Sequence, residues 1–448
     1  MFRFLRAVMT SSTTPRVPIP ANGVDYRGKV VLAPMVRSGE LPSRLLALNY
    51  GADLVWGPET IDRSLIGAQR RVNSRSGVIE YTRLPSNGGR KDAAAQESII
   101  YRIDPVREKG KLIFQIGTAN PEYAVQAAKM VAGDVAGIDV NSGCPKPFST
   151  SGGMGAALLR TPDRLCSILE ALVEEVGKPY QIGISVKIRI LPEPGVTEAL
   201  VSRLVKTGIT GLTVHCRTPP MRPRERAIRD QLRMVASICH DAGIPCVMNG
   251  DVTSRDQGLA LMEEFGVDGA MIATAAENNS SCFRSEAEGG LLPFMEVVHT
   301  YMKLCLETEN RFGNTKYLMN MIIPGKNKEL QDTKTARSYA DYCQILKFDD
   351  LLPAALHLDE LLNLTDKSAH YKGEARSKAA QNALENNETA RAAGGASRPK
   401  SASPVASGVG PIRTNSIPKP TKPMPETEAN IEITATAPEA AQKQEVTA

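Results

Sequence analysis

The sequence predicts an α/β protein, a TIM (β/α)8 barrel followed by a smaller all-helical domain. Short β-rich runs alternate with stretches of helical spacing from about residue 29 to residue 273, which is the rhythm of a parallel sheet covered by helices. Eight such units in roughly 250 residues match a barrel of this kind in size and count. The alternative, an open doubly wound sheet, would carry G-x-G-x-x-G after its first strand, where this chain has Ala33, Pro34 and Met35.

The β-rich runs define the strands that we expect in the barrel. They are residues 30–34, 53–56, 112–115, 136–140, 184–188, 211–215, 245–249 and 269–273. Segments of helical spacing separate most of them, and each is long enough for a crossover between parallel strands; examples are 162–175, 196–207 and 231–242. Residues 63–110 form a longer connection than usual. We interpret it as an insertion with a strand of its own, 77–82, at the rim of the active face.

The pattern divides the chain into four segments. We expect a flexible N-terminus at 1–27, the barrel at 28–284, a smaller helical domain at 285–364 and a disordered tail at 365–448. Helical patterns at 294–308, 314–323 and 335–346 support the third segment. The fourth is rich in small, polar and charged residues and cannot bury enough apolar surface to fold. Residues 1–23 contain three Arg and no acid, which is typical of a mitochondrial presequence and also of a frayed basic terminus; we favour the frayed terminus.

The composition is that of a soluble globular protein. Hydrophobic residues make up 42% of the 448 and charged residues 23%, and no apolar run reaches the ~18 residues of a transmembrane helix. The net charge of +5 permits a polyanionic partner but is weak evidence for one. The 8 cysteines include no Cys-x-x-Cys pair, which disfavours a zinc ribbon or a disulfide scaffold. We therefore expect no metal site and a reducing compartment.

Polar residues at the ends of the strands are the candidate functional residues, because active sites of such barrels form at the carboxyl ends of the strands. Lys187 lies near the end of a mostly apolar strand, and burying its charge is costly unless it meets an anion or a dipole. The barrel is therefore predicted to hold an anionic ligand. Gly250 with Asp251, and Ala273 with Thr274, follow the last two strands, the usual phosphate position. Each residue alone has a structural explanation; their convergence favours a site.

The most specific stretch lies at residues 139–159. It contains Asp-Val-Asn-Ser-Gly-Cys-Pro-Lys at 139–146 and Ser-Gly-Gly-Met-Gly-Ala-Ala-Leu-Leu at 151–159. Together with Leu-Ala-Pro-Met at 32–35 and His-Cys-Arg-Thr at 215–218, it closely resembles the signature of the tRNA-dihydrouridine synthase family. The resemblance covers about residues 29–276, with a weaker match through about residue 346. Within the family, residues 32–37, 45–53 and 314–317 are most similar to the eukaryotic branch that modifies position 20 of the tRNA D-loop.

The resemblance implies an FMN-dependent oxidoreductase that reduces the C5=C6 bond of a uridine in tRNA, with NADPH as reductant. Hydride would pass from flavin N5 to C6, and Cys144 would give a proton to C5. A thiol with an ordinary pKa of about 8.5 is protonated near neutral pH, which suits this role. By motif position, the residues that would hold the FMN are Pro34, Met35, Gln115, Lys187, His215, Asn249, Gly250, Asp251, Ala273 and Thr274.

Candidate contacts to the tRNA come from the same motif and from the charge pattern. Asn141 would orient the base, and Lys146 would neutralise a phosphate or the developing charge. Arg217 on the barrel rim and Lys316 in the helical domain would contact the tRNA, in company with Arg222, Arg224, Arg226, Lys326, Lys328, Lys334 and Arg337. A base within folded tRNA must be flipped out to reach a flavin, so the mechanism requires a positively charged cradle.

Two positions depart from the family pattern. Thr274 stands where the family usually has Arg after the eighth strand, and Ser142 replaces a more usual Met. The missing Arg could weaken FMN binding by about 1.5 to 3 kcal/mol unless another cation replaces it. This keeps a flavin-free RNA-binding pseudoenzyme as an alternative. A flavin reductase of a free pyrimidine is the other, against which the helical domain and the basic rim argue. We expect a monomer that acts in the cytoplasm or nucleus.

Overall fold

Eight parallel strands close a barrel in the computed structural model, which describes residues 16–83, 98–325 and 328–364. The strands are β1 (Lys29–Leu32), β2 (Val55–Trp56), β7 (Leu112–Gly117), β8 (Gly137–Ser142), β9 (Gly183–Arg189), β10 (Gly211–His215), β11 (Cys246–Asn249) and β12 (Gly269–Ile272). The ring closes because β2 pairs with both β1 and β7. The predicted TIM barrel is confirmed. The predicted tail, 365–448, and residues 1–15 of the N-terminal segment lie outside the described residues.

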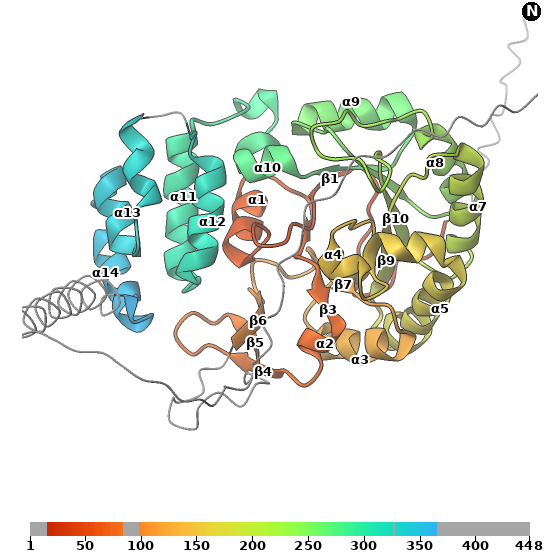
Figure 1. Ribbon diagram of the computed structural model, residues 1–448, viewed down its shortest axis with the longest axis horizontal. Coiled ribbons are helices and arrows are strands. Elements are labelled where there is room, and N and C mark those ends of the chain that lie inside the picture. Colours follow the sequence, from red (N-terminus) through yellow and green to blue (C-terminus); the bar gives the residue numbers. More distant parts are fainter. Residues whose placement is uncertain (1–15, 84–97, 326–327, 365–448) are drawn as a thin grey trace, which may run out of the picture. The chain divides into compact units, whose positions relative to one another are not determined.

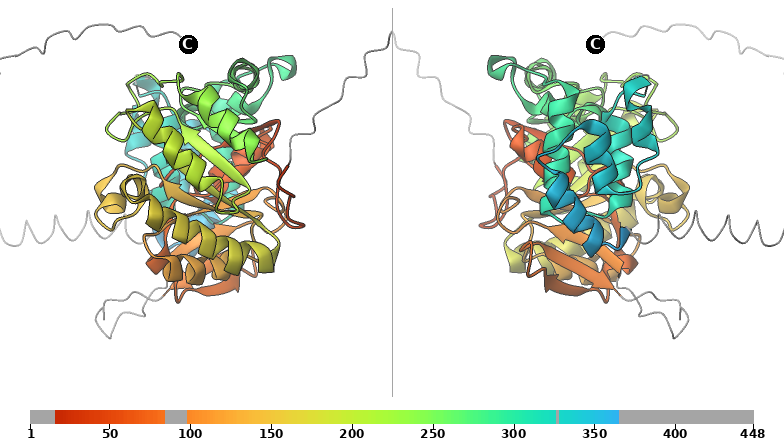
Figure 2. Two further views of the ribbon diagram at one scale, coloured as in Figure 1. Left: turned by 90° about the vertical axis from the view of Figure 1, so that its right-hand side faces the viewer. Right: turned by 90° about the vertical axis from the view of Figure 1, so that its left-hand side faces the viewer.

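The helices between the strands lie around the barrel (Figures 1 and 2). They include α3 (Pro121–Val131), α5 (Pro162–Leu172), α7 (Pro194–Leu204), α8 (Leu232–Asp241) and α9 (Arg255–Phe265). Local sequence explains where they begin: Pro occupies the first turn of α3, α5 and α7, and the side chains of Asn120 and Ser254 cap α3 and α9. No helix in the described part of the chain is long and apolar enough to cross a membrane.

The barrel buries its strands on both faces, as their aliphatic runs predict. Every residue of β7 and β8 is buried. Part of the interior is filled by a cluster that includes Tyr26, Trp56 and Met271. A Cβ at Gly211 would lie 2.5 Å from the ring of Tyr26, so this strand needs glycine where the ring crosses it.

One barrel strand is interrupted on the way to the active face. Strand β2 resumes as β3 (Thr60–Ile61), and both pair with β7. Trp56 lies opposite Ile113 and Thr60 opposite Ile116, so residues 57–59 face only two residues of β7. One extra residue in one strand of a pair is a β-bulge, a feature that is common beside active sites because it re-aims a side chain.

The insertion is larger than the single strand expected at 77–82. It contains α2 (Asp62–Leu65) and a three-stranded antiparallel sheet of β4 (Gln69–Val72), β5 (Ile79–Arg83) and β6 (Ser98–Ile103). Val78, beside β5, packs into the core of the helical domain, and Arg102 of β6 donates hydrogen bonds to the carbonyls of Thr308 and Glu309. The insertion therefore joins the barrel to the helices that follow it.

The helical domain consists of α11 (Phe294–Glu307), α12 (Phe312–Ile322), α13 (Tyr339–Leu346) and α14 (Leu352–Leu361), gathered together in Figure 1. The sequence pattern predicted the first three; α14 was not foreseen. Their core includes Leu41, Leu45 and Leu46 of α1 (Leu41–Asn49). The remaining short elements are α4 (Pro147–Thr150), η1 (Gly155–Arg160), η2 (Val173–Gly177), α6 (Lys178–Tyr180), α10 (Thr274–Asn278), η3 (Ser280–Phe283), η4 (Glu286–Glu288) and η5 (Lys328–Lys334).

Candidate active site

A cavity of about 340 Å³ lies at the carboxyl ends of the barrel strands, within the ~300–1,000 Å³ range of small-molecule sites. It brings together most of the residues that the sequence singled out. The predicted site residues that line it are Pro34, Met35, Gln115, Asn141, Cys144, Lys146, Lys187, His215, Asn249, Ala273 and Thr274. Residues from seven different segments of the chain therefore meet at one cavity, although each segment alone gave only a weak signal.

The loop after β8 holds Cys144 at the edge of this cavity. The side-chain oxygen of Asn141 accepts hydrogen bonds from the amides of Gly143 (2.9 Å) and Cys144 (3.1 Å). Arg189 Nε donates to the carbonyl of Gly143 at 2.7 Å. Cys144 is the only one of the eight cysteines, all in the described part of the chain, that is not buried. Its thiol is thus both fixed by its backbone and open to a ligand.

The Gly-rich stretch after Cys144 packs against its backbone. The amide of Ala156 donates to the carbonyl of Cys144 at 2.9 Å. Gly155 has φ of +57°, and a Cβ there would lie 2.4 Å from Ser149 Oγ and 2.6 Å from the Cys144 carbonyl oxygen. Only glycine fits this approach. The Gly-Gly-Met-Gly sequence therefore shapes the wall beside the thiol.

Basic side chains of β9 and β10 line the same cavity, and the pKa of each is lowered. Lys187 Nζ donates to Asn249 Oδ1 at 3.0 Å, and burial, followed by the charge of Arg189, lowers the pKa of Lys187 to about 8. Burial lowers the pKa of Arg189 to about 10. Burial and the nearby Lys187, Arg189 and Arg217 lower the pKa of His215 to about 2. His215 is therefore a neutral imidazole at physiological pH.

A buried carboxyl lies beneath the cavity. Gln115 Nε2 donates to Asp139 Oδ2 at 2.8 Å, and Ser185 Oγ donates to Asp139 Oδ1 at 2.7 Å. Burial raises the pKa of Asp139 to about 6. The charge of Asp139 in turn favours the ammonium form of Lys187. The network holds the amide of Gln115 in one orientation towards the cavity it lines.

Four of the predicted site residues do not line this cavity. Gly250 and Asp251 form the turn after β11, and both have positive φ. Arg217 is buried, forms an ion pair with Asp251 and donates to the carbonyls of Pro223 and Glu225. Arg217 therefore braces this turn.

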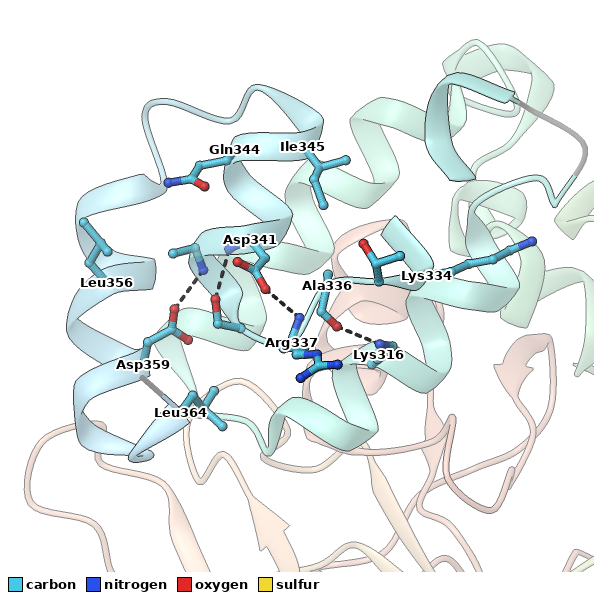
Figure 3. Close-up of a pocket in the computed structure, with 13 residues that line it drawn as sticks. Lys316, Lys334, Ala336, Arg337, Asp341, Gln344, Ile345, Leu356, Asp359 and Leu364 are labelled. Carbon is cyan, nitrogen blue, oxygen red and sulfur yellow. Dashed lines mark hydrogen bonds between the residues drawn. The ribbon is translucent and has the colours of Figure 1, made fainter. Parts of the chain in front are cut away.

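The fourth, Lys316 of α12, lines a different cavity in the helical domain, of about 910 Å³. Its Nζ donates to the carbonyl of Ala336 at 2.6 Å (Figure 3). The same cavity is lined by Lys334, Arg337 and Asp359. It is the larger of the two but contains none of the strand-end residues, so the candidate site for chemistry is the cavity beside Cys144.

The comparison with protein families agrees with this geometry. Residues 31–347 match the family described as dihydrouridine synthase (Dus). This chain belongs to the dihydrouridine synthase family. The match extends from β1 through α13, so it includes the barrel, the insertion and most of the helical domain.

Relatives within the dihydrouridine synthase family are similar over the same part of the chain. A Schizosaccharomyces pombe protein named tRNA-dihydrouridine(20) synthase [NAD(P)+] is 49% identical over 71% of this chain, which spans 64% of that protein's length. A Saccharomyces cerevisiae protein of the same name is 43% identical over 72% of this chain and 84% of its own length. Among solved structures, DHODH from Eimeria tenella matches with a TM-score of 0.36 and 12% identity over 55% of this chain and 76% of its own, too weak a likeness to argue from.

The structure adds cavity residues that the sequence analysis did not select as site residues. These residues include Arg189, Glu59, Phe148, Glu277 and Tyr317. Tyr317 is in the Asn-Thr-Lys-Tyr stretch that carried the resemblance to the position-20 branch, which was an available signal. Glu59 had none, because the bulge that places it depends on pairing with β7.

Tyr317 brings the helical domain to the cavity. It belongs to α12, and the guanidinium of Arg37 lies over its ring, 4.4 Å from the centroid. Arg37 follows β1 and has φ of +75°. A cation over a ring is worth roughly 0.5–2 kcal/mol, so this pair fixes an aromatic face from the second domain at the mouth of the barrel. The insertion was expected at the rim of the active face, but none of its described residues lines the cavity.

Proposed function

We propose that this chain reduces a uridine of tRNA to dihydrouridine, at position 20 of the D-loop, with FMN as cofactor and NADPH as reductant. Membership of the dihydrouridine synthase family supports this, as do the names of two similar relatives, both tRNA-dihydrouridine(20) synthases [NAD(P)+]. The observation that carries the proposal is the position of Cys144. It is an accessible thiol at the mouth of a barrel, beside a buried ammonium and a neutral imidazole.

The residues at the cavity fit a flavin. Lys187 is a largely buried cation whose side chain lines the cavity, and its hydrogen bond among the described residues is to the neutral amide of Asn249, so its ammonium can take a further electronegative partner. Ser38 Oγ lines the cavity, is buried and has no hydrogen-bond partner among the described residues. The polar edge of an isoalloxazine ring would satisfy these groups. FMN would be held by the ten residues that the resemblance implied, from Pro34 to Thr274.

The missing family arginine at Thr274 has a structural substitute nearby. Arg229 donates to the carbonyls of Gly250 (3.0 Å) and Asp251 (3.2 Å), in the turn where the phosphate is expected. Its Nε is buried and has no partner in the described part of the chain. We assign to Arg229 the positive charge that Thr274 cannot supply. This favours a flavin-binding enzyme over a flavin-free pseudoenzyme.

The chain's own residues would act on the uracil in two ways. A bound reduced flavin would supply hydride to C6. The Cys144 S–H bond would then break as a C5–H bond forms, because the electron pair left at C5 needs a proton. Burial raises the pKa of Cys144, so the thiol is in its acid form at neutral pH. Asn141, fixed by the loop amides, and Lys187 would orient the base from below.

The tRNA would approach across the rim and the helical domain. Lys334 and Arg337 line the helical-domain cavity with Lys316 (Figure 3). Lys326 and the side chain of Lys328 lie outside the described residues. Phosphate contacts of this kind supply affinity without reading sequence. Because tRNA is the proposed substrate, we place the activity in the cytoplasm or nucleus.

Two measurements on the purified protein test the proposed function. The visible spectrum should show flavin maxima, and the released cofactor should be FMN by mass. Incubation with NADPH and unmodified tRNA should give a mass gain of two hydrogens in the D-loop fragment that contains position 20, and none with free uracil or uridine. A colourless protein that binds tRNA would support the pseudoenzyme instead, and turnover of the free base alone would support a pyrimidine reductase.

A further inference from the structure

Glu59 lies in the cavity of Cys144 for a reason that is visible in the fold. It is the last residue of the β-bulge between β2 and β3, after Gly57 and Pro58. Proline has no amide hydrogen to give to the neighbouring strand, which suits it to a bulge. A Cβ at Gly57 would lie 1.7 Å from the hydroxyl oxygen of Tyr101, and one at Gly117 would lie 2.5 Å from Glu59 Oε1. Gly117 therefore makes room for this carboxyl, and Gly57 lets the bulge pass the hydroxyl of Tyr101.

The Glu59 carboxyl is held by the loop that carries the thiol. Ser149 Oγ donates to Glu59 Oε1 at 3.1 Å, and Ser149 is the residue against which Gly155 closes the wall beside Cys144. Glu59 Oε2 is buried, with no hydrogen-bond partner of ordinary geometry among the described residues. Burial raises the pKa of Glu59, whereas the hydrogen bond from Ser149 lowers it. The carboxyl and the thiol therefore line the same cavity, and Ser149 lies beside both Glu59 and the backbone of Cys144.

Burial has the largest effect on the Cys144 thiol and raises its pKa, but the cations around the thiol act in the opposite direction. Lys146 and Arg189 carry positive charges that lower its pKa, and Lys187 is close enough for its own pKa to feel the thiolate. Cations beside a cysteine stabilise the thiolate, but an acid that protonates C5 must keep its hydrogen until the reaction. Glu59 is the carboxyl that acts on the thiol in the opposite sense, because its charge disfavours the thiolate.

We propose that Glu59 keeps Cys144 protonated, so that the cations needed for an anionic cofactor and substrate do not convert the acid of the reaction into a thiolate. This rests on the proposed function, in which Cys144 is the proton donor. Glu59 acts through Cys144 and is a positioning residue. The groups that face the pair are Asn141, Lys146 and Ser149 from the β8 loop, with Lys187 and Arg189 from β9.

The test measures the ionisation of Cys144 directly. The flavin-loaded protein is alkylated with iodoacetamide across a pH series, and the modified residue is located by mass spectrometry; the seven other cysteines are buried, so Cys144 dominates the early rate. In Glu59→Gln the midpoint of the rate profile should fall by roughly one pH unit, the low end of the effect of a neighbouring charge. Glu59→Asp keeps the charge but moves it away from the thiol, so its alkylation midpoint should lie between those of Glu59→Gln and wild type. Glu122→Gln, an exposed carboxyl on α3, should match wild type.

A second readout links the midpoint to the reaction. The alkaline limb of the pH profile for single-turnover dihydrouridine formation should move down in Glu59→Gln by the same amount as the alkylation midpoint. If Glu59→Gln does not fold, Glu59→Asp provides the test, and its alkylation midpoint should lie below that of wild type. An unchanged or raised midpoint overturns the proposal, including the case in which uridine reduction is lost, since Glu59 would then contact substrate instead. If the alkylation midpoint falls in Glu59→Gln but the wild-type protein makes no dihydrouridine, the effect of Glu59 on Cys144 stands and the proposed function is refuted.

Discussion

Replacement of Cys144 by Ala tests the proposed chemistry with the smallest structural change. Cys144 borders the cavity and is only partly buried, so loss of its sulfur atom leaves no enclosed void. The loop should keep its shape because Asn141, Arg189 and Ala156 hold backbone atoms, not the thiol. We therefore expect normal folding and a normal flavin content, with the loss confined to the reaction.

The size of the loss follows from the role. A positioned general acid contributes about 10²- to 10⁴-fold, or roughly 2.7 to 5.4 kcal/mol of the barrier. No second residue takes over easily: burial holds the pKa of His215 at about 2, so it carries no proton to give at neutral pH, and Lys187, at about 8, is engaged with Asn249. Cys144→Ala should therefore lose at least two orders of magnitude in the rate of dihydrouridine formation.

The assay is single turnover with enzyme reduced beforehand by NADPH, because it isolates the step on the uracil from the step that reduces the flavin. The rate of NADPH oxidation without tRNA should equal that of wild type. A Cys144→Ala variant that converts bound tRNA within a few-fold of the wild-type rate would refute the assignment. A variant that loses flavin would show that the thiol matters for the cofactor site, contrary to the backbone contacts above.

Three further outcomes follow from the structure. Lys187→Met should weaken FMN binding and abolish its pH dependence; in wild type, affinity should decline above about pH 8, where Lys187 loses its proton, as measured by flavin fluorescence titration. Arg44→Met should lower the free energy of unfolding in urea by about 3 to 5 kcal/mol, because it strands the carboxylate of a fully buried ion pair. The double variant Lys334→Ala and Arg337→Ala should weaken tRNA binding and make its salt dependence less steep by up to about 1.8, whereas Lys303→Ala, elsewhere in the helical domain, should change neither.

Each of these has a result that would contradict it. Stoichiometric, equally tight FMN in Lys187→Met would make the lysine a purely structural residue. The same ammonium also has a stability signature: its pKa falls from 10.5 to about 8 on folding, so its burial cost of about 3 kcal/mol is present below pH 8 and fades as pH rises towards 10.5. Apo Lys187→Met should thus gain stability over wild type at pH 7 but not near pH 10.5. Arg44→Met with wild-type urea unfolding, or an unchanged tRNA salt slope in the helical-domain double variant, would refute the other two.

Local sequence was sufficient to predict the barrel and to single out Cys144, which lines the cavity. Every predicted strand overlaps an observed one, because strands buried on both faces are continuous apolar runs that need no knowledge of their neighbours. Cys144 was singled out for a similar reason: Asn141, whose side chain holds the loop amides, and Gly155, which permits a close approach to the Cys144 carbonyl, belong to the same continuous stretch of sequence as the thiol. Such short-range constraints are written directly in the sequence.

Only the tertiary structure decided which side chains from distant segments meet at the cavity. Pairing with β7 creates the bulge that turns Glu59 towards the thiol, and contact between α12 and the β1 loop brings Tyr317 to the cavity. It also showed that two residues grouped by the charge pattern already have partners within the protein. Arg217 forms an ion pair with Asp251, and Lys316 donates a hydrogen bond to a carbonyl of its own domain. The physical reason is that a side chain's role depends on which groups satisfy it, and for these residues those partners are far away in the sequence.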